Sequence, residues 1–454
     1  MAITAIAEKI LLGLFGLGIV VFVHESGHFL GARAMGIAVE TFSIGWGKAL
    51  VKKKIGETEY RLSLFPMGGY CKMRGDSDYQ KAYETKADEY PPGSYFGVKP
   101  WRRIVVCIAG PLFNLLFSML VLTIIWGVGF EVETLDNRIV LASDITPGET
   151  YPADKSGLLT GDRIVLIGSN EIANYHDIQE AIIPNAEVTL PVRVDRNGVL
   201  IDLTLRPLLD KSTGAGKIGV YFWTDPIIAG VSPGGLGEKA GLQAGDRIVR
   251  INGEDFPYTV AIFRILQNNP PELAVEFERA GILHTTLIPV SENGQEGIDL
   301  GIAYHTLRYR SPRYSPLGAL AKGSHEAWKT LVISVQSLSL LFRGIDLTRA
   351  VSGPVRITYL VGEAAAEGFE QSFGAGVSSM ASFLSLISIA LCMMNLLPLP
   401  ILDGGLVILF VIETIKGKAL HPKAIFAFQT LGVVLICSLM LFAFFGDILF
   451  LIRR

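Results

Sequence analysis

Long uncharged runs of apolar residues alternate with polar stretches along this chain of 454 residues. A helix needs about 20 apolar residues to cross a bilayer, and four segments reach this length. They cover residues 3–30, 104–128, 380–402 and 424–445. The pattern therefore predicts a polytopic α-helical membrane protein with four transmembrane helices. Because no small-residue cleavage site follows the first apolar run, we expect a transmembrane helix there and not a cleaved signal peptide.

The polar insert between the second and third spans contains an internal repeat. Seven residues recur at a constant offset of 241 − 157 = 84, namely Gly157, Leu158, Gly161, Asp162, Arg163, Ile164 and Val165 as Gly241, Leu242, Gly245, Asp246, Arg247, Ile248 and Val249. A unit of this length suits a small domain, and the alternating residues at 188–194 and 274–277 predict strands. Each copy resembles a PDZ domain of the bacterial, circularly permuted kind, in which a GLxxGDxI segment joins a short helix to a strand.

Two short motifs in the insert bear on ligand binding. Residues 218–220 (Ile-Gly-Val), just ahead of the second copy, resemble the loop that receives a peptide C-terminus in PDZ domains. Residues 300–302 (Leu-Gly-Ile) repeat the pattern where no third copy follows, so an ordinary strand start is an equally good interpretation. The GLxxGDxI segment itself chiefly builds a turn.

After the insert, residues 316–345 carry apolar side chains at helical spacing, with Lys322, His325 and Glu326 among them. The uncharged stretch 330–342 is too short to span a bilayer. We therefore expect an amphipathic helix that lies on the outer leaflet or packs on the membrane core.

Basic residues near the span ends set the expected orientation. Those between the first two spans are Arg33, Lys48, Lys52, Lys53, Lys54, Arg102 and Arg103, and those between the last two are Lys416, Lys418 and Lys423. The positive-inside rule places both loops in the cytoplasm, and the insert and the termini outside. Arg453 and Arg454 at the C-terminus count mildly against this orientation.

Composition agrees with a membrane protein. Hydrophobic residues make up 50% of the chain and charged residues 18%, and the mean hydropathy is +0.41. The net charge of −3 favours no nucleic-acid partner. The four cysteines, at positions 71, 107, 392 and 437, follow no metal-ligand spacing, and none lies in residues 131–305. A disulfide framework is therefore excluded from the insert.

A metal-binding motif lies at the end of the first span, where residues 24–28 read HESGH. Residues four apart share one face of a helix, so His24 and His28 can bind one ion while Glu25 reaches a water on that ion. Two histidines and a glutamate also reach this spacing by chance. An ionisable group at the centre of a span costs about 2.5–3.5 kcal/mol, however, and this cost favours a functional cluster.

The third span holds the candidate for the third ligand that a zinc site needs. Residues 395–405 read NLLPLPILDGG, where Pro398 and Pro400 break the helix and Asp403 follows at membrane depth. An Asp-Gly turn at a helix end is the structural alternative. A turn does not explain a carboxylate in hydrocarbon surroundings, whereas a divalent ion would neutralise it. Asp403 is therefore the predicted third ligand.

Two asparagines also lie within the predicted spans. Asn114 belongs to the sequence AGPLFN in the second span, and Asn395 precedes the prolines of the third. Each can serve the site or satisfy backbone groups freed by Pro111 or Pro398. The sequence leaves both alternatives open.

Together, HExxH in the first span, GPxxN in the second, NxxPxPxLDGG in the third and the tandem PDZ-like repeat resemble the site-2 protease family of intramembrane zinc metalloproteases. Within that family the regulator of sigma-E protease group is the most similar, and the resemblance covers essentially the whole chain. It implies that His24, His28 and Asp403 bind Zn²⁺. It also implies that Glu25 is the catalytic base and that Asn395 helps to hold the substrate.

The resemblance extends to residues 40–73, which are similar to the family's membrane-reentrant β-hairpin. Tyr60, Leu62 and Leu64 alternate there, and residues 68–69 (Gly-Gly) mark a turn. The tip at residues 52–54 (Lys-Lys-Lys) is polar, as expected for a cytoplasmic turn.

The expected fold class is a polytopic α-helical membrane protein with four transmembrane helices, a membrane-reentrant β-hairpin and two extracytoplasmic PDZ domains. Its parts are transmembrane helix 1 with the zinc motif (1–36), the hairpin region (37–100), transmembrane helix 2 (101–128), PDZ domain 1 (129–216), PDZ domain 2 (217–306), an amphipathic helical region (307–376), and transmembrane helices 3 and 4 (377–454).

The function that the resemblance implies is hydrolysis of a peptide bond within the transmembrane segment of single-span membrane proteins. The implied substrates are anti-sigma factors after a first cleavage and remnant signal peptides, and the implied setting is the lipid bilayer of a bacterial inner membrane during a stress response. The PDZ domains would lie in the periplasm as a size filter. The active site would lie toward the cytoplasm.

Two other classes of protein share some of these features. A proteolytically inactive membrane receptor with PDZ domains would keep the spans and the repeat, but it needs no cluster of His24, Glu25, His28 and Asp403. An ion-coupled transporter could use Asp403 and Asn395, but transporters usually repeat within the membrane, and here the repeat lies outside it. Metal analysis of the purified protein distinguishes a metalloprotease from the receptor, and ion flux in vesicles distinguishes it from the transporter.

Overall fold

The computed structural model describes residues 2–77, 90–211, 214–267, 270–290, 301–304, 306–340 and 353–452. Two compact units divide the chain, Met1–Phe130 with Ser311–Arg454, and Glu131–Arg310. The first unit is mainly helical, and the second, formed by the insert, is mainly β. Each unit is described by itself below.

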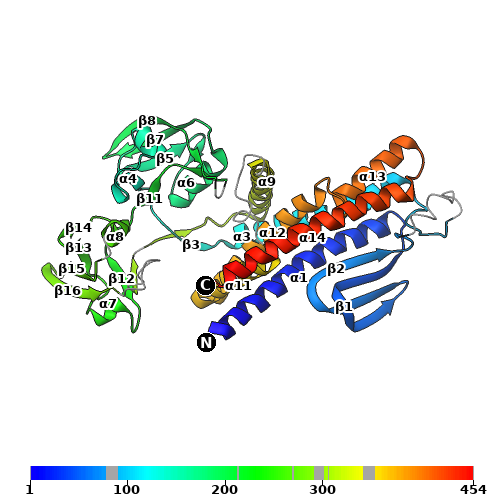
Figure 1. Ribbon diagram of the computed structural model, residues 1–454, viewed down its shortest axis with the longest axis horizontal. Helices are drawn as coiled ribbons and strands as arrows, with labels where there is room; N and C mark the ends of the chain where they lie inside the picture. The colour runs from blue at the N-terminus through cyan, green and yellow to red at the C-terminus, as the bar shows by residue number, and fades with distance from the viewer. Residues whose placement is uncertain are drawn as a thin grey trace. The chain divides into compact units, whose positions relative to one another are not determined.

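The helical unit contains the long helices of the chain (Figure 1). Its helices are α1 (Ala2–Ala34), α3 (Pro100–Val128), α9 (Pro316–Leu340), α11 (Pro354–Gln371), α12 (Phe373–Leu396), α13 (Asp403–Lys416) and α14 (Pro422–Ile452). Within the described residues, four helical segments are long and apolar enough to cross a membrane: Glu8–Ala34, Pro100–Val128, Phe373–Leu396 and Lys423–Phe444. The four predicted spans therefore correspond to α1, α3, α12 and α14.

The third span differs from the expected 380–402. Helix α12 begins at Phe373 and ends at Leu396, because Pro398 disfavours helical backbone at the residue before it and offers no N–H to continue the helix. A separate helix, α13, then begins at Asp403. The break predicted at Pro398 and Pro400 is therefore present, although the apolar pattern alone extended the span to residue 402.

Helices α9 and α11 pack against the long apolar helices. Helix α9 packs against α3 and α12, and α11 packs against α1 and α12. Lys322 of α9 pairs with Glu326 at 2.6 Å and lies over the Trp126 ring of α3 at 4.9 Å. The expected amphipathic helix at 316–345 is therefore present as α9 and packs on α3, while residues 341–345 lie outside the described part of the chain.

Small residues allow α1 and α3 to approach closely. A Cβ added to Gly31 would lie 2.8 Å from Cβ of Ala109, and one added to Gly27 would collide with the Ala109 carbonyl. In a bilayer, where lipid tails are as apolar as side chains, such close backbone packing holds helices together. The contact fixes the zinc motif of α1 against the GPxxN segment of α3.

The two strands of the helical unit, β1 (Val39–Ile55) and β2 (Thr58–Met73), form an antiparallel hairpin. Phe42 of β1 pairs with both Tyr60 and Cys71, so the two halves of β2 flank the start of β1. Gly68 (φ +141°) lies where β2 passes from one side to the other. The expected turn at Gly68-Gly69 is thus a bend within β2, and the hairpin tip is at residues 56–57.

The β unit contains the two sequence repeats as two similar four-stranded sheets, β6-β5-β7-β8 and β14-β13-β15-β16. The first copy contains β4 (Ile139–Leu141), α4 (Ala142–Ile145), α5 (Pro152–Ser156), β5 (Arg163–Ile167), β6 (Asn170–Glu171), α6 (Tyr175–Ile182), β7 (Leu190–Arg196), β8 (Val199–Leu205), β9 (Leu208–Leu209), β10 (Gly216–Lys217) and β11 (Val220–Phe222). The second copy contains β12 (Ile228–Val231), α7 (Leu236–Lys239), β13 (Arg247–Ile251), β14 (Glu254–Asp255), α8 (Ile262–Leu266), β15 (Glu272–Arg279), β16 (Ile282–Pro289) and β17 (Ile302–Tyr304). Two 3₁₀ turns, Ile183–Asn185 and Thr259–Ala261, complete the copies, and β3 (Glu131–Thr134) pairs with β18 (Leu307–Arg310) at their ends.

Each copy is closed by the strand that follows it in sequence. Strand β11 pairs with β4, and β17 pairs with β12. The Ile-Gly-Val motif at 218–220 therefore belongs to the first copy, although it stands just ahead of the second. Gly301 and Ile302 lie at the equivalent place at the end of the second copy. This position explains why the Leu-Gly-Ile motif at 300–302 occurs with no third copy after it. Leu300 lies outside the described residues.

A buried ion pair recurs in the two copies. The carboxylates of Asp162 and Asp246 have only 1% of their surface exposed and pair with Arg196 and Arg279 at 2.8 Å and 2.6 Å. Each arginine also donates to the carbonyl of the glycine that begins the repeated segment. Arg196 donates to Gly157 at 2.8 Å, and Arg279 donates to Gly241 at 2.9 Å. The aspartate of GLxxGDxI therefore anchors the turn to the strand β7 or β15.

We expect Arg279→Ala to destabilise the β unit by about 2–3 kcal/mol, because it leaves Asp246 buried without its partner. Urea-dependent proteolysis of the full-length protein in detergent would measure this loss. Arg250→Ala is the matched control, since Arg250 pairs at 3.1 Å with an Asp255 side chain that is 84% exposed. The control should change stability by less than about 0.5 kcal/mol, and an equal loss in both variants would contradict the role of burial.

The same ion pair sets a pH dependence. Burial raises the pKa of Asp246, but the hydrogen bonds from Arg279 and the Gln243 N–H lower it further, so that its pKa lies below the ordinary value. A depressed pKa stabilises the folded state above the unfolded pKa of about 3.9. The contribution is lost as pH falls through the folded pKa. The stability difference between the wild type and Arg279→Ala should therefore shrink below about pH 4.

Candidate metal centre

Helices α1 and α13 bring three potential metal ligands together. His24 and His28 lie one turn apart on α1, and Asp403 is the first residue of α13. The Nε2 atoms of the two histidines are 3.1 Å apart, and each is 3.4 Å from Oδ2 of Asp403. Within the described residues, these three form the one group with metal-ligand geometry.

The spacing of these atoms suits a tetrahedral zinc site. Zinc binds nitrogen and carboxylate oxygen at about 2.0–2.1 Å, so the edges of its coordination tetrahedron are about 3.3 Å long. The three observed separations, 3.1, 3.4 and 3.4 Å, describe one face of such a tetrahedron. The donor set of two imidazoles and one carboxylate also suits zinc, and the fourth position remains open for water.

The ring of His28 is fixed from the α3 side. Its Nδ1 lies 2.9 Å from the carbonyl oxygen of Val106 and can donate to it, which leaves the Nε2 lone pair for a metal. A Cβ added to Gly110 would collide with the His28 ring. The close approach of this imidazole therefore explains the glycine of GPxxN, Gly110. The sequence did not reveal this contact.

Glu25 lies between the histidines and the hairpin. A Cβ added to Gly69 of β2 would lie 3.1 Å from Cγ of Glu25, so β2 passes directly beside this residue. Glu25 is also close enough to His24, His28 and Asp403 to interact electrostatically with all three. The bend of β2 thus borders the site, a contact that no pattern in the sequence indicated.

Helix α13 is held to α3 by a buried ion pair. Arg103 and Glu413 are 3.0 Å apart with 6% and 4% of their side chains exposed. The Arg103 guanidinium lies over the rings of Phe96 and Phe410, at 5.0 and 4.6 Å. Arg103 was predicted to be one of the basic residues of a cytoplasmic loop, but it is buried. The pair fixes the helix on which Asp403 stands.

The two asparagines have different surroundings. Asn114 lies fully buried on α3, with its side-chain amide nitrogen 3.2 Å from Nδ1 of His24. It therefore faces the site and does not serve the backbone around Pro111. Asn395 lies in the last turn of α12, partly buried, just before the bend that leads to Asp403. Its role with a substrate stays a prediction.

Comparison with known proteins identifies the class. Peptidase family M50 matches residues 12–439. The chain is 36% identical over 448 residues to a protein named as a zinc metalloprotease in Treponema pallidum (strain Nichols), covering 98% of this chain and 99% of the other. It is 31% identical over 462 residues to the regulator of sigma-E protease RseP of Escherichia coli (strain K12), covering 95% and 96%. A protein named as a zinc metalloprotease in Borreliella burgdorferi is 28% identical over 432 residues, covering 93% of this chain and 94% of the other.

The fold, the site and these relatives define an intramembrane zinc metalloprotease. The chain belongs to peptidase family M50, the site-2 protease family, and it is similar to RseP. The predicted resemblance and the predicted zinc cofactor are confirmed.

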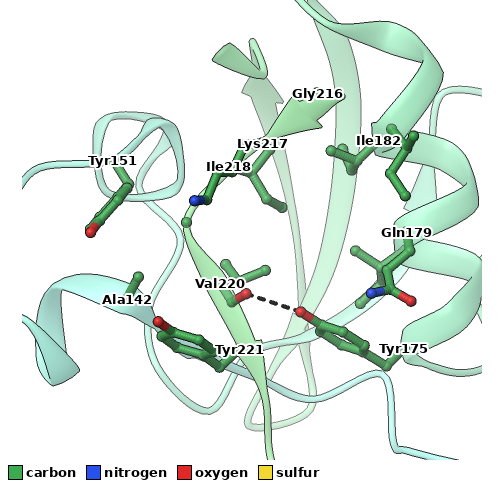
Figure 2. A pocket seen from close by; sticks show the side chains of 13 residues that line it. Ala142, Tyr151, Tyr175, Gln179, Ile182, Gly216, Lys217, Ile218, Val220 and Tyr221 are labelled. Carbon is green, nitrogen blue, oxygen red and sulfur yellow. Dashed lines mark hydrogen bonds between the residues drawn. The ribbon is translucent and has the colours of Figure 1, made fainter. Parts of the chain in front are cut away.

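A second concave site lies in the first copy of the β unit. A cavity of about 270 Å³ opens between α6 and the segment that leads into β11 (Figure 2). The Tyr175 hydroxyl donates to the Val220 carbonyl at 3.0 Å across this cavity. Gly219 has a φ of +78°, and a Cβ added to it would collide with the Tyr151 ring. Two tyrosines of the same copy therefore already contact the edge of β11.

Proposed function

We propose that His24, His28 and Asp403 hold the zinc ion and that Glu25 is the catalytic base of peptide-bond hydrolysis within the membrane. The observation that carries this proposal is the tetrahedral spacing of three ligand atoms beside Glu25. When bound, zinc lowers the pKa of water to about 7 and polarises a carbonyl. Glu25 would accept the proton from the water and deliver it to the leaving amine.

The hairpin offers a way to hold the substrate. A transmembrane helix hides its carbonyls in its own hydrogen bonds, so it must unwind before it can be cut. Residues 69–73 of β2 pair with β1 on one side, and among the described strands none lies on the other. This edge runs beside Glu25, so an extended substrate segment could add to it by backbone pairing. Asn395 would then fix the substrate backbone near Asp403.

The hairpin is proposed to enter the membrane. Its exposed side chains include large apolar residues on both strands, and Trp46, Leu50, Val51, Leu62, Leu64 and Phe65 each have between 47% and 63% of their surface exposed. Such a patch on a small sheet is typical of contact with lipid or a partner. The lysines at 52–54 near the tip are exposed as well, which suits a tip at the aqueous boundary.

The proposed location is a bacterial inner membrane, with the β unit in the periplasm and the metal centre toward the cytoplasm. Figure 1 shows the start of α1 and the end of α14 at one end of the helical unit, and α13 with the hairpin at the other. The exposed basic residues Arg33, Arg102, Lys416 and Lys418 belong to the end with α13. The positive-inside rule places that end in the cytoplasm.

The proposed substrates are single-span membrane proteins, such as anti-sigma factors after a first cleavage and remnant signal peptides. The relative in Escherichia coli bears the name regulator of sigma-E protease, which supports this class. Purified protein incubated with a panel of single-span segments, each with and without a folded outer domain, tests the class by the size of the products.

The two copies of the β unit are proposed to be PDZ-like domains that act as a size filter. Their shared strand order and closing strands support this assignment. In the first copy, two tyrosines lie against the segment that a bound peptide strand would approach: the Tyr175 hydroxyl donates to the Val220 carbonyl at 3.0 Å, and a Cβ added to Gly219 would collide with Tyr151. Obstruction by bulk is therefore better supported than capture of a peptide C-terminus.

Deletion of the β unit tests the filter. Phe130 and Ser311 exchange backbone and side-chain hydrogen bonds of 2.9 Å, so the cut ends are already adjacent and a short linker can replace residues 131–310. This boundary follows the compact unit, which ends at Arg310, whereas the sequence placed the end of PDZ domain 2 at residue 306. We expect the deletion variant to cleave substrates that keep a large outer domain, because nothing then excludes them.

The control is a substrate with its outer domain already trimmed, which both proteins should cleave at similar rates. Product analysis by gel mobility measures both reactions. If the deletion variant still cleaves only trimmed substrates, the filter lies in the helical unit and the proposal for the β unit is wrong.

A further inference from the structure

Asn114 is the polar residue next to the metal centre that the proposed mechanism does not use. It is fully buried on α3, and its amide nitrogen lies 3.2 Å from Nδ1 of His24. Its Oδ1 is buried as well and has no hydrogen-bond partner among the described residues. A buried amide that is bonded on one atom only is costly, so its presence beside a metal ligand calls for an explanation.

The ligand geometry decides which amide atom His24 needs. Nε2 of His24 is the atom that faces His28 and Asp403, so a metal must bind there. A neutral imidazole that offers the Nε2 lone pair carries its proton on Nδ1, and Nδ1–H needs an acceptor. The amide oxygen of Asn114 is such an acceptor, whereas the amide nitrogen is not.

Rotation of the amide by 180° exchanges its oxygen and nitrogen without changing its shape. Within the described part of the chain the rotation breaks no other hydrogen bond, because Oδ1 has none there and the amide nitrogen is bonded to His24 alone. Metal binding at Nε2 therefore selects the orientation in which Oδ1 accepts from His24.

The backbone around Asn114 is held firmly enough for this function. Its carbonyl accepts a hydrogen bond of 2.9 Å from Ser388 of α12, and one turn further on Ser118 and Ser385 are bonded at 2.5 Å. One turn earlier, Gly110 lies against the ring of His28. The same stretch of α3 thus contacts both histidine ligands.

We propose that Asn114 is a positioning residue that fixes the tautomer and ring orientation of His24, as the Val106 carbonyl does for His28. The proposal rests on the metal ligands named in the proposed function. Partners of this kind hold a histidine ligand in place, and their loss typically weakens metal binding by 10–100-fold.

The test is the zinc dissociation constant of the full-length protein in detergent, measured by competition with a chromophoric chelator. Asn114→Leu removes the acceptor, and zinc binding should weaken by about 10–100-fold. Asn114→Asp keeps an acceptor oxygen but has no donor, so it should bind zinc within a few-fold of the wild type. Ser118→Ala is the matched control, because it removes a buried hydrogen bond of α3 without touching His24, and its zinc affinity should stay unchanged.

Each outcome bears on a different claim. If the wild type binds no zinc, the proposed metal ligands fail. If the wild type binds zinc and Asn114→Leu binds it equally well, the proposal for Asn114 is wrong. A loss in Asn114→Asp as large as that in Asn114→Leu, with Ser118→Ala unchanged, also overturns it, because the amide would then act as a donor. The Asp variant decides the matter even where the Leu variant fails to fold.

Discussion

Glu25→Gln is expected to lower turnover of a cleavable transmembrane segment by 10⁴-fold or more. Glutamine keeps the size and shape of the side chain but cannot accept a proton. General base catalysis typically contributes 10²–10⁴-fold, and here the same carboxylate also returns the proton to the leaving amine, so the loss should reach or exceed the top of that range. The zinc content should not change, since Glu25 is not among the three ligand atoms.

The measurement compares wild type and variant at matched zinc content, with cleavage scored by product size and the uncleaved substrate recovered as a complex. Ser26→Ala is a suitable control, because the neighbouring Ser26 hydroxyl donates to the Phe22 carbonyl within α1. It should keep activity within a few-fold of the wild type. Retention of more than about a tenth of wild-type turnover in Glu25→Gln would rule out Glu25 as the base. An inactive receptor predicts no difference between the proteins.

Asp403→Ala is expected to abolish cleavage and to weaken zinc binding by more than about 100-fold, because the site loses one of its three protein ligands, the one that carries a negative charge. The protein should stay inserted and folded. Helix α13 is held to α3 by the buried pair of Arg103 and Glu413, and that pair does not involve Asp403.

Zinc content by elemental analysis and cleavage of a single-span substrate measure the two effects. Glu363→Gln is the control for loss of a carboxylate elsewhere in the helical unit, since Glu363 pairs with Lys9 at 3.0 Å. It should keep its zinc. Full zinc occupancy and normal cleavage in Asp403→Ala would remove Asp403 from the site, and the transporter alternative would then regain support.

The sequence predicted the histidines and Asp403 of the metal centre more fully than it predicted the role of Asn114. His24 and His28 follow from helical geometry, because a spacing of four fixes their common face whatever surrounds the helix. Asp403 was predicted from the cost of a carboxylate at membrane depth, and the structure brings it to 3.4 Å from both histidines. Asn114 was noted as polar and intramembrane, but its partner was left open, since nothing in a single span indicates which side chain of another span it meets.

The β unit shows the same limit. Its duplication was evident from residues that recur at constant offset, but the assignment of the Ile-Gly-Val motif to one copy or the other was not. Strand β11 pairs with β4, about 80 residues earlier in the chain. Pairing over such a distance depends on which edges are left free after the local sheet has formed, and sequence adjacency suggested the wrong copy.

The sequence by itself determined the membrane class, the four apolar helices, the repeat and the zinc motif, because each of these depends on periodicity or length within one segment. Only the tertiary structure decided the burial of Arg103 against Glu413, the place of β2 beside Glu25 and the contact of Asn114 with His24. Each of these contacts joins residues that are far apart in the chain, from 44 positions between Glu25 and Gly69 to 310 positions between Arg103 and Glu413. Contacts at such distances are set by how helices and strands pack, and packing is a property of the assembled fold and not of any one segment.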